Sequence, residues 1–145
     1  MTFRAWTGDP GVDAIIAREI RYGQTRWTEV WLSLVMVLFG VVLIWPQPTF
    51  VGPQWRVVAA YVSEAQAGHA ALAAGLVRLV ALWINGRRRE TPIARTLGCA
   101  AGFLFWMALA AGFALAVPPL STGLAVYPVL ALAELHSSYR AAGDL

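Results

Sequence analysis

The chain has 145 residues, enough for one domain, of which 59% are hydrophobic and only 13% are charged. A soluble domain carries about 25% charged residues, and a soluble chain of this length could not bury so much apolar surface. The composition therefore predicts an integral membrane protein. The net charge of +3 is the balance of eleven arginines and eight acidic residues, and the chain has no lysine. In a membrane protein this charge is typical of cytoplasmic loops rather than of nucleic-acid binding.

A short amphipathic helix, lying in the membrane interface, is predicted at residues 9–23. Asp9-Pro10 is typical of a helix start, with Asp9 as the N-cap and Pro10 at the first helical position. Tyr22-Gly23 is expected to end this helix. Packing on another cytoplasmic segment is the alternative to lipid contact. The apolar face comprises Val12, Ile15, Ile16 and Ile20.

The first membrane span is predicted at residues 27–45, which would form about 28 Å of helix, close to the thickness of a bilayer core. Trp27 and Trp45 mark its two ends, as aromatic residues do at membrane interfaces. Prolines interrupt the chain up to Pro53. Residues 54–62 are then expected to form a short interfacial or re-entrant helix.

The second span is predicted at residues 64–85. Ser63 and Gln66 match a capping box at its start, and Asn85-Gly86 is a typical helix end.

Two further spans complete the prediction. The third is expected at residues 92–117, because Thr91-Pro92 is typical of a helix start. The fourth is expected at residues 120–139, where the apolar stretch is short and Pro128 interrupts it. A re-entrant or steeply kinked helix is the alternative for this last segment.

The arginines indicate the topology of this four-span, all-α polytopic fold. The N-terminal segment, the loop between spans two and three, and Arg140 in the tail fall on one side, whereas Arg56 falls on the other. The positive-inside rule then places both termini in the cytoplasm. Attraction to lipid headgroups is a second role for the basic residues around this loop. These are Arg87, Arg88, Arg89 and Arg95.

Three ionisable residues fall within the second span, where such residues are functional hypotheses by default. Glu64 lies in the first turn, where the helix dipole also favours a carboxylate simply as a cap. Arg78 is close enough to the cytoplasmic end for its side chain to reach the headgroups. His69 is either hydrogen-bonded between helices or a ligand or proton relay.

No pattern of catalytic, cofactor-binding or metal-ligating residues is present in the sequence. Cys99 stands alone, so it cannot form an internal disulfide or a cysteine-based metal site. His69 and His136 fall at opposite membrane faces and are too few for a zinc site. We therefore expect a protein that is not an enzyme and that uses no cofactor.

Stripes of small residues on spans two and three are typical of closely packed membrane helices. They predict that these two spans pack together, or that one of them faces a neighbouring copy. The residues concerned are Gly68, Ala71 and Gly75 on the second span, and Ala94, Gly98 and Gly102 on the third.

Two stretches carry a resemblance, "RLVALWINGRRRETPIAR" at residues 78–95 and "STGLAVYPVLALAELHSSYRAAGDL" at residues 121–145. They resemble small membrane proteins encoded by phages and prophages of GC-rich bacteria, sometimes called holin-like. The resemblance implies a protein of the bacterial inner membrane. Such a protein would form homo-oligomers through its small-residue helix faces and would permeabilise the membrane.

Two other hypotheses stay open. An accessory or structural subunit, or a superinfection-exclusion factor, would dock a membrane partner protein through the N-terminal helix and the basic loop. A small four-helix transporter is similar in length to multidrug pumps, which need a membrane-embedded glutamate in the first span. The first span is expected to lack one at membrane depth, and Glu64 would be the substitute. The lipid bilayer is a partner under every hypothesis, and nucleic acid under none.

Overall fold

The structure, a computed structural model, describes residues 9–85, 92–116 and 121–142. Within these residues all regular structure is helical, which confirms the all-α prediction. In chain order the elements are α1 (Pro10–Ile44), the 3₁₀ helix η1 (Pro53–Trp55), α2 (Arg56–Ala59), α3 (Glu64–Asn85), α4 (Pro92–Leu115) and α5 (Gly123–Ala142).

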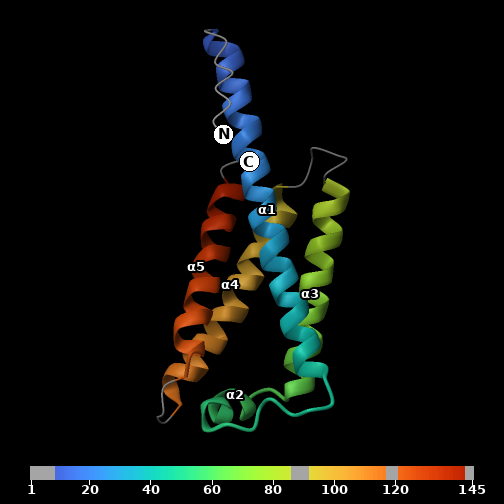
Figure 1. Cartoon of the computed structure of the whole chain (residues 1–145), viewed down its shortest axis with the longest axis vertical. Coiled ribbons are helices and arrows are strands. Elements are labelled where there is room, and N and C mark those ends of the chain that lie inside the picture. The colour runs from blue at the N-terminus through green and yellow to red at the C-terminus, as the bar shows by residue number, and fades with distance from the viewer. Residues whose placement is uncertain (1–8, 86–91, 117–120, 143–145) are drawn as a thin grey trace.

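The four long helices form two antiparallel hairpins, α1 with α3 and α4 with α5, and contact between the hairpins is more limited. In Figure 1 the hairpins approach each other where α3 finishes, and they spread apart toward α2. We call these two ends of the molecule the Asn85 end and the α2 end. The interface between the hairpins therefore differs from one end to the other.

Glycines allow α1 and α3 to approach closely. A Cβ atom built on Gly40 would lie 2.8 Å from the carbonyl oxygen of Gly68, and one on Gly75 would lie 2.9 Å from that of Ser33. These distances leave no room for a methyl group, as is common where membrane helices pack through small residues. The small-residue stripe of α3 thus packs against α1 of the same chain, rather than against α4 or another copy.

Helix α1 is longer than the sequence predicts, because it continues from Pro10 to Ile44 through Tyr22-Gly23. Its start is as predicted, with the Asp9 carboxylate accepting a hydrogen bond from the Gly11 amide at 2.8 Å. A glycine inside a helix is unfavourable by only about 1 kcal/mol relative to alanine, which a long helix tolerates. The predicted helix end at Tyr22-Gly23 is therefore wrong, and the location of this segment at the membrane interface stays a prediction. This part of α1 extends beyond the hairpins (Figure 1).

Three helices of the described chain are long and apolar enough to cross a membrane. The candidate spans are Arg26–Ile44, Glu64–Ile84 and Ile93–Leu115. Helix α5 is not among them, because its second half is polar. The structure thus supports a protein with three candidate spans, and the fourth predicted span is not shown.

Aromatic side chains pack together toward the α2 end. Phe39 of α1 lies edge-on to Trp106 of α4, with ring centroids 5.2 Å apart, and to Tyr127 of α5 at 6.1 Å. Trp55 of η1 packs edge-on against Phe113 at 4.6 Å. The segment at residues 54–62, predicted as interfacial or re-entrant, lies across the α2 end of the molecule (Figure 1).

Candidate functional site

A buried ion pair joins the two hairpins between α3 and α5. The Arg78 guanidinium donates two hydrogen bonds to the Glu134 carboxylate, at 2.5 Å from Nη1 and 2.9 Å from Nη2. The Glu134 side chain is fully buried and that of Arg78 is only 8% exposed. The arginine therefore turns into the protein, rather than reaching out to the headgroups as its position in the sequence also allowed.

A second buried ion pair joins the same hairpins between α1 and α4. Arg95 donates from Nε to one oxygen of Glu29 at 3.0 Å and from Nη2 to the other at 2.6 Å. Both side chains are almost fully buried. Two parallel hydrogen bonds of this kind are the strong, directional form of an arginine–carboxylate contact.

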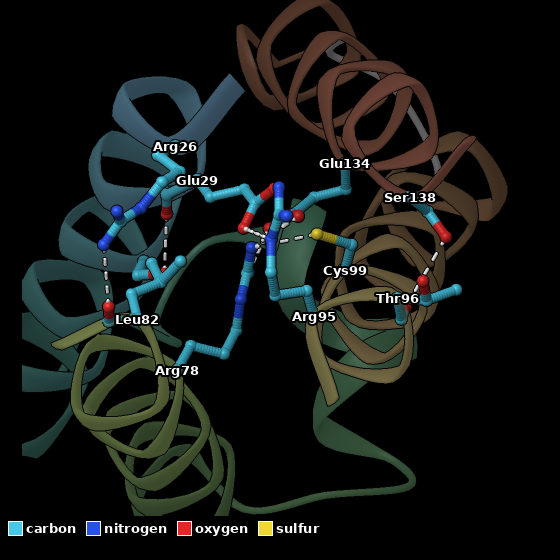
Figure 2. A network of polar contacts seen from close by, with 10 residues as sticks. Arg26, Glu29, Arg78, Leu82, Arg95, Thr96, Cys99, Glu134 and Ser138 are labelled. Atoms are coloured by element: carbon cyan, nitrogen blue, oxygen red, sulfur yellow. Dashed lines mark hydrogen bonds and ion pairs between the residues drawn. The ribbon is translucent and has the colours of Figure 1, made fainter. Parts of the chain in front are cut away.

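The two ion pairs are reciprocal, as Figure 2 shows. The α1–α3 hairpin contributes Glu29 and Arg78, and the α4–α5 hairpin contributes Arg95 and Glu134. Each hairpin thus presents one positive and one negative charge to the other. We call these four side chains the charge cluster. Since every pair crosses from one hairpin to the other, neither hairpin can satisfy its own charges in this arrangement.

Small residues on α4 make the room for this cluster. A Cβ atom on Gly102 would lie 2.5 Å from Glu134 Oε1, and one on Gly98 would lie 3.2 Å from Arg78 Cγ. The buried Cys99 thiol accepts a contact from Arg78 Nη2 at 3.6 Å. The small-residue stripe of the third span therefore accommodates charged side chains of neighbouring helices. The alanines of the two predicted stripes differ, because Ala71 on α3 is fully buried, whereas Ala94 on α4 is exposed.

Further polar groups lie beside the cluster. Ser33 Oγ donates to the carbonyl oxygen of Glu29 at 2.7 Å. Ser137, one helical turn after Glu134, is buried, and its hydroxyl has no hydrogen-bond partner among the described residues. The interface near the Asn85 end is therefore polar as well as charged, in contrast to the aromatic packing at the α2 end.

The other ionisable residues singled out in the sequence lie apart from this cluster. Glu64 holds the loop before η1, because its carboxylate accepts hydrogen bonds from the amides of Thr49, at 2.6 Å, and Phe50, at 3.1 Å, and from the Thr49 hydroxyl. His69 is exposed, and its Nδ1 lies 2.6 Å from the carbonyl oxygen of Ala65 in its own helix. Both residues thus bond to nearby groups of the loop or of their own helix rather than to the charge cluster.

The predicted helix start before α3 is confirmed. The Ser63 amide donates to Gln66 Oε1 at 3.0 Å, and the Gln66 amide donates to Ser63 Oγ at 3.2 Å. These reciprocal bonds are those of a capping box. The basic loop residues Arg87, Arg88 and Arg89 lie outside the described residues.

Neither Glu29 nor Glu134 was singled out from the sequence as a functional residue. A signal for Glu29 was present, since it begins a stripe on α1 at alternating spacings of four and three residues. The structure buries this whole stripe, which runs Glu29, Ser33, Met36, Gly40 and Leu43. The statement that the first span lacks a glutamate at depth is thus wrong, because Glu29 lies within the candidate span Arg26–Ile44.

The described residues contain no group of three or more His, Cys, Asp or Glu side chains that could hold a metal ion. Both carboxylates of the charge cluster are engaged by arginines. The chemistry available at the cluster is therefore ion pairing and hydrogen bonding. Comparison of the chain with protein-family models, with curated proteins and with solved structures finds no match.

Proposed function

We propose that this chain is a non-enzymatic, holin-like protein of a bacterial inner membrane, which permeabilises the bilayer when its two hairpins separate. The observation that supports this proposal is the charge cluster. Four ionisable side chains lie between two hairpins that otherwise contact each other to a limited extent. Separation of the hairpins would turn a closed apolar bundle into two units with charged faces.

Exposed charges of this kind cannot stay in lipid. An unpaired ionised side chain at membrane depth is strongly unfavourable, so the separated faces would need either water or a partner of opposite charge. A second copy supplies that partner, because the α1–α3 hairpin of one copy carries the charges that match the α4–α5 hairpin of the next. Exchange of hairpins would therefore produce oligomers with a polar interior.

This mode of association differs from the one that the sequence suggested. Gly68 and Gly75 pack against α1, and Gly102 packs against the ion pair of Arg78 and Glu134. These small-residue faces are occupied within the chain. The proposed oligomer therefore forms through the charge cluster, with the glycines holding each hairpin together.

The proposal includes a fourth pass through the membrane. Helix α5 packs along α4 and places Glu134 against Arg78 of the candidate span Glu64–Ile84. Its polar second half faces the protein at Glu134 and Ser137, which are buried. With the positive-inside rule, four passes put the Asn85 end in the cytoplasm, together with both termini.

Regulated expression in a bacterial host tests this function. We expect loss of the membrane potential, followed by lysis only when an endolysin is expressed with the chain. A chain that inserts in the membrane but leaves the potential unchanged contradicts the proposal.

The native Cys99 reports the proposed separation directly. It is the single cysteine of the chain and is buried beside Arg78. A water-soluble maleimide should not label it in intact resting cells, but should label it as the potential collapses, with Cys99→Ser as the control. Depolarisation without labelling would rule out separation of the hairpins while leaving permeabilisation itself intact.

A second candidate function is that of an accessory membrane subunit. The extension of α1 beyond the hairpins favours it, because this helix offers a partner protein a surface outside the bundle (Figure 1). Purification in a mild detergent distinguishes the two functions. A stoichiometric partner protein favours the accessory subunit, and a homo-oligomer favours the holin-like protein.

A transporter fits the contacts less well. Glu29 and Glu134 are both buried, but each is held by two hydrogen bonds from an arginine. Glu64, the residue that this hypothesis relied on, is occupied by the loop at Thr49 and Phe50. No described carboxylate among these three is left open to a substrate cation.

A further inference from the structure

An apolar pocket of about 430 Å³ lies at the α2 end, where the hairpins spread apart. Its walls come from α3 and α4 and its base from α2 and the residues just after it. The volume falls within the range of small-molecule sites, roughly 300–1,000 Å³. The lining includes Val57, Tyr61, Ala70, Ala108, Ala111 and Leu115.

The pocket lies within the membrane-spanning part of the protein. Ala67 and Ala70 are three and six residues from the start of the candidate span Glu64–Ile84, which places them about 5–9 Å inside it by the helical rise. On the other wall, Ala108 and Leu115 belong to the last part of the span Ile93–Leu115. The walls of the pocket on α3 and α4 therefore lie at a depth where hydrocarbon surrounds the protein.

The occupant must be apolar. Almost all of the lining is carbon, and apolar cavities stay dry because water finds no hydrogen-bond partners in them. In a bilayer, the molecules that surround α3 and α4 at this depth are lipid acyl chains.

The base of the pocket also fits a lipid headgroup. Arg56 is exposed and directly precedes Val57, which lines the pocket. Tyr61, another lining residue, is 89% exposed. A basic and an aromatic side chain at this level are what an anionic headgroup contacts at a membrane interface. Both ends of a phospholipid thus find matching chemistry, the chain in the pocket and the phosphate near Arg56.

We propose that this pocket is a binding site for one acyl chain of an anionic phospholipid from the leaflet at the α2 end. The site is separate from the charge cluster, which joins the hairpins at their other end. The inference depends on insertion in a membrane and not on permeabilisation, so either proposal can fail without the other.

Photo-crosslinking in liposomes tests the site. The full chain is reconstituted with phosphatidylglycerol that contains a tracer carrying a diazirine in its acyl chain, and adducts are mapped by mass spectrometry. We expect adducts concentrated on the pocket walls at Ala70, Ala108 and Ala111. Adducts spread evenly over the exposed faces of α3 and α4 would overturn the proposal.

A matched pair of variants on α4 makes the test specific. Ala108→Phe fills the pocket, whereas Ala101→Phe adds the same side chain two turns away on the same face, at an exposed position. Adducts in the pocket should disappear in the first variant and persist in the second. Ala111→Leu fills the pocket with a smaller side chain and replaces Ala108→Phe should that variant misfold. Labelling that persists in every pocket-filling variant would overturn the site.

The headgroup and a competing occupant are tested in the same liposomes. Arg56→Gln should lower the yield of pocket adducts about fivefold in phosphatidylglycerol, which corresponds to ~1 kcal/mol for one arginine near an anionic surface. It should have no effect in phosphatidylcholine alone. If the parent protein and the Arg56→Gln variant give equal yields of adducts in phosphatidylglycerol, the headgroup has no part in the binding site.

A second copy of the protein is the competing occupant of the pocket. A cross-link from a photoreactive residue at position 108 to a second copy, in place of lipid, would assign the pocket to self-association instead.

Discussion

At the scale of single residues, the charge cluster pairs each buried arginine with a buried carboxylate. Arg78 and Glu134 are both removed from solvent, and the guanidinium donates two hydrogen bonds to the carboxylate. Loss of one partner of a buried pair leaves an uncompensated charge, which is strongly unfavourable, whereas replacement of both by apolar residues is often tolerated.

Single and double substitutions at this pair are therefore expected to lower the free energy of unfolding by different amounts. Arg78→Met alone should lower the free energy of unfolding by about 3–5 kcal/mol, because Glu134 is left buried and unpaired. Arg78→Met combined with Glu134→Leu should recover most of that loss. Thermal unfolding in detergent, followed by tryptophan fluorescence, measures both. A double variant as unstable as the single one would mean that the two side chains act independently.

The glycines of α4 support the same pair. Gly102→Ala should destabilise the protein by about 1–3 kcal/mol, the usual range for an overpacked interior, because the new methyl group meets Glu134 Oε1 at 2.5 Å and Arg78 Nη1 at 2.9 Å. Gly98→Ala is the matched control, since its nearest contact is the flexible Arg78 Cγ at 3.2 Å. The same unfolding measurement should show the smaller effect at Gly98, and an equal effect at both positions would contradict this packing.

At the scale of helices, the hairpin of α1 and α3 is held by backbone proximity. Gly40 of α1 meets the backbone of α3 directly, with a built Cβ only 2.5 Å from the amide nitrogen of Leu72. Backbone atoms cannot move aside as a side chain can. Arg26 adds a hydrogen bond to the carbonyl oxygen of Leu82 at 3.1 Å, near the Asn85 end of the same hairpin.

Gly40→Ala should consequently separate α1 from α3. We expect a larger loss of thermal stability than for Gly102→Ala, since no side-chain rotation relieves the clash. Gly11→Ala, near the start of α1, is the control, because its nearest contact is the Asp9 side chain at 3.3 Å. Unchanged stability of Gly40→Ala would show that the hairpin is more loosely packed than these distances indicate.

At the scale of the whole molecule, the two ends of the interface between the hairpins differ in character. Aromatic rings from α1, α4 and α5 meet at the α2 end, whereas the ion pairs lie toward the Asn85 end. Aromatic rings would lose little free energy if contact with lipid replaced their contact with each other, because hydrocarbon is as apolar as the rings themselves. Under the proposed function, the charged end is the part that responds to water or to a second copy.

The proposed function therefore predicts that stability and activity can be separated. A chain with Arg78→Met and Glu134→Leu should remain folded in the membrane but depolarise cells more slowly, since its separated hairpins carry fewer charges. His69→Gln, at an exposed position on α3, should depolarise cells as the parent chain does. A membrane-potential dye after induction measures the rates. Unchanged depolarisation by the double variant would mean that this pair does not take part in permeabilisation.

The amino-acid sequence by itself determined the helical class, the apolar stretches of the three candidate spans, and the helix starts at Asp9 and Ser63. These features depend on hydrophobicity and on hydrogen bonds between residues a few positions apart, which a sequence displays directly. Tertiary structure alone decided that Arg78 faces Glu134 and that Glu29 faces Arg95, residues separated by 56 and 66 positions. Their pairing depends on which helices become neighbours, and backbone contact through Gly40, Gly68 and Gly75 fixes the neighbours of α1 and α3.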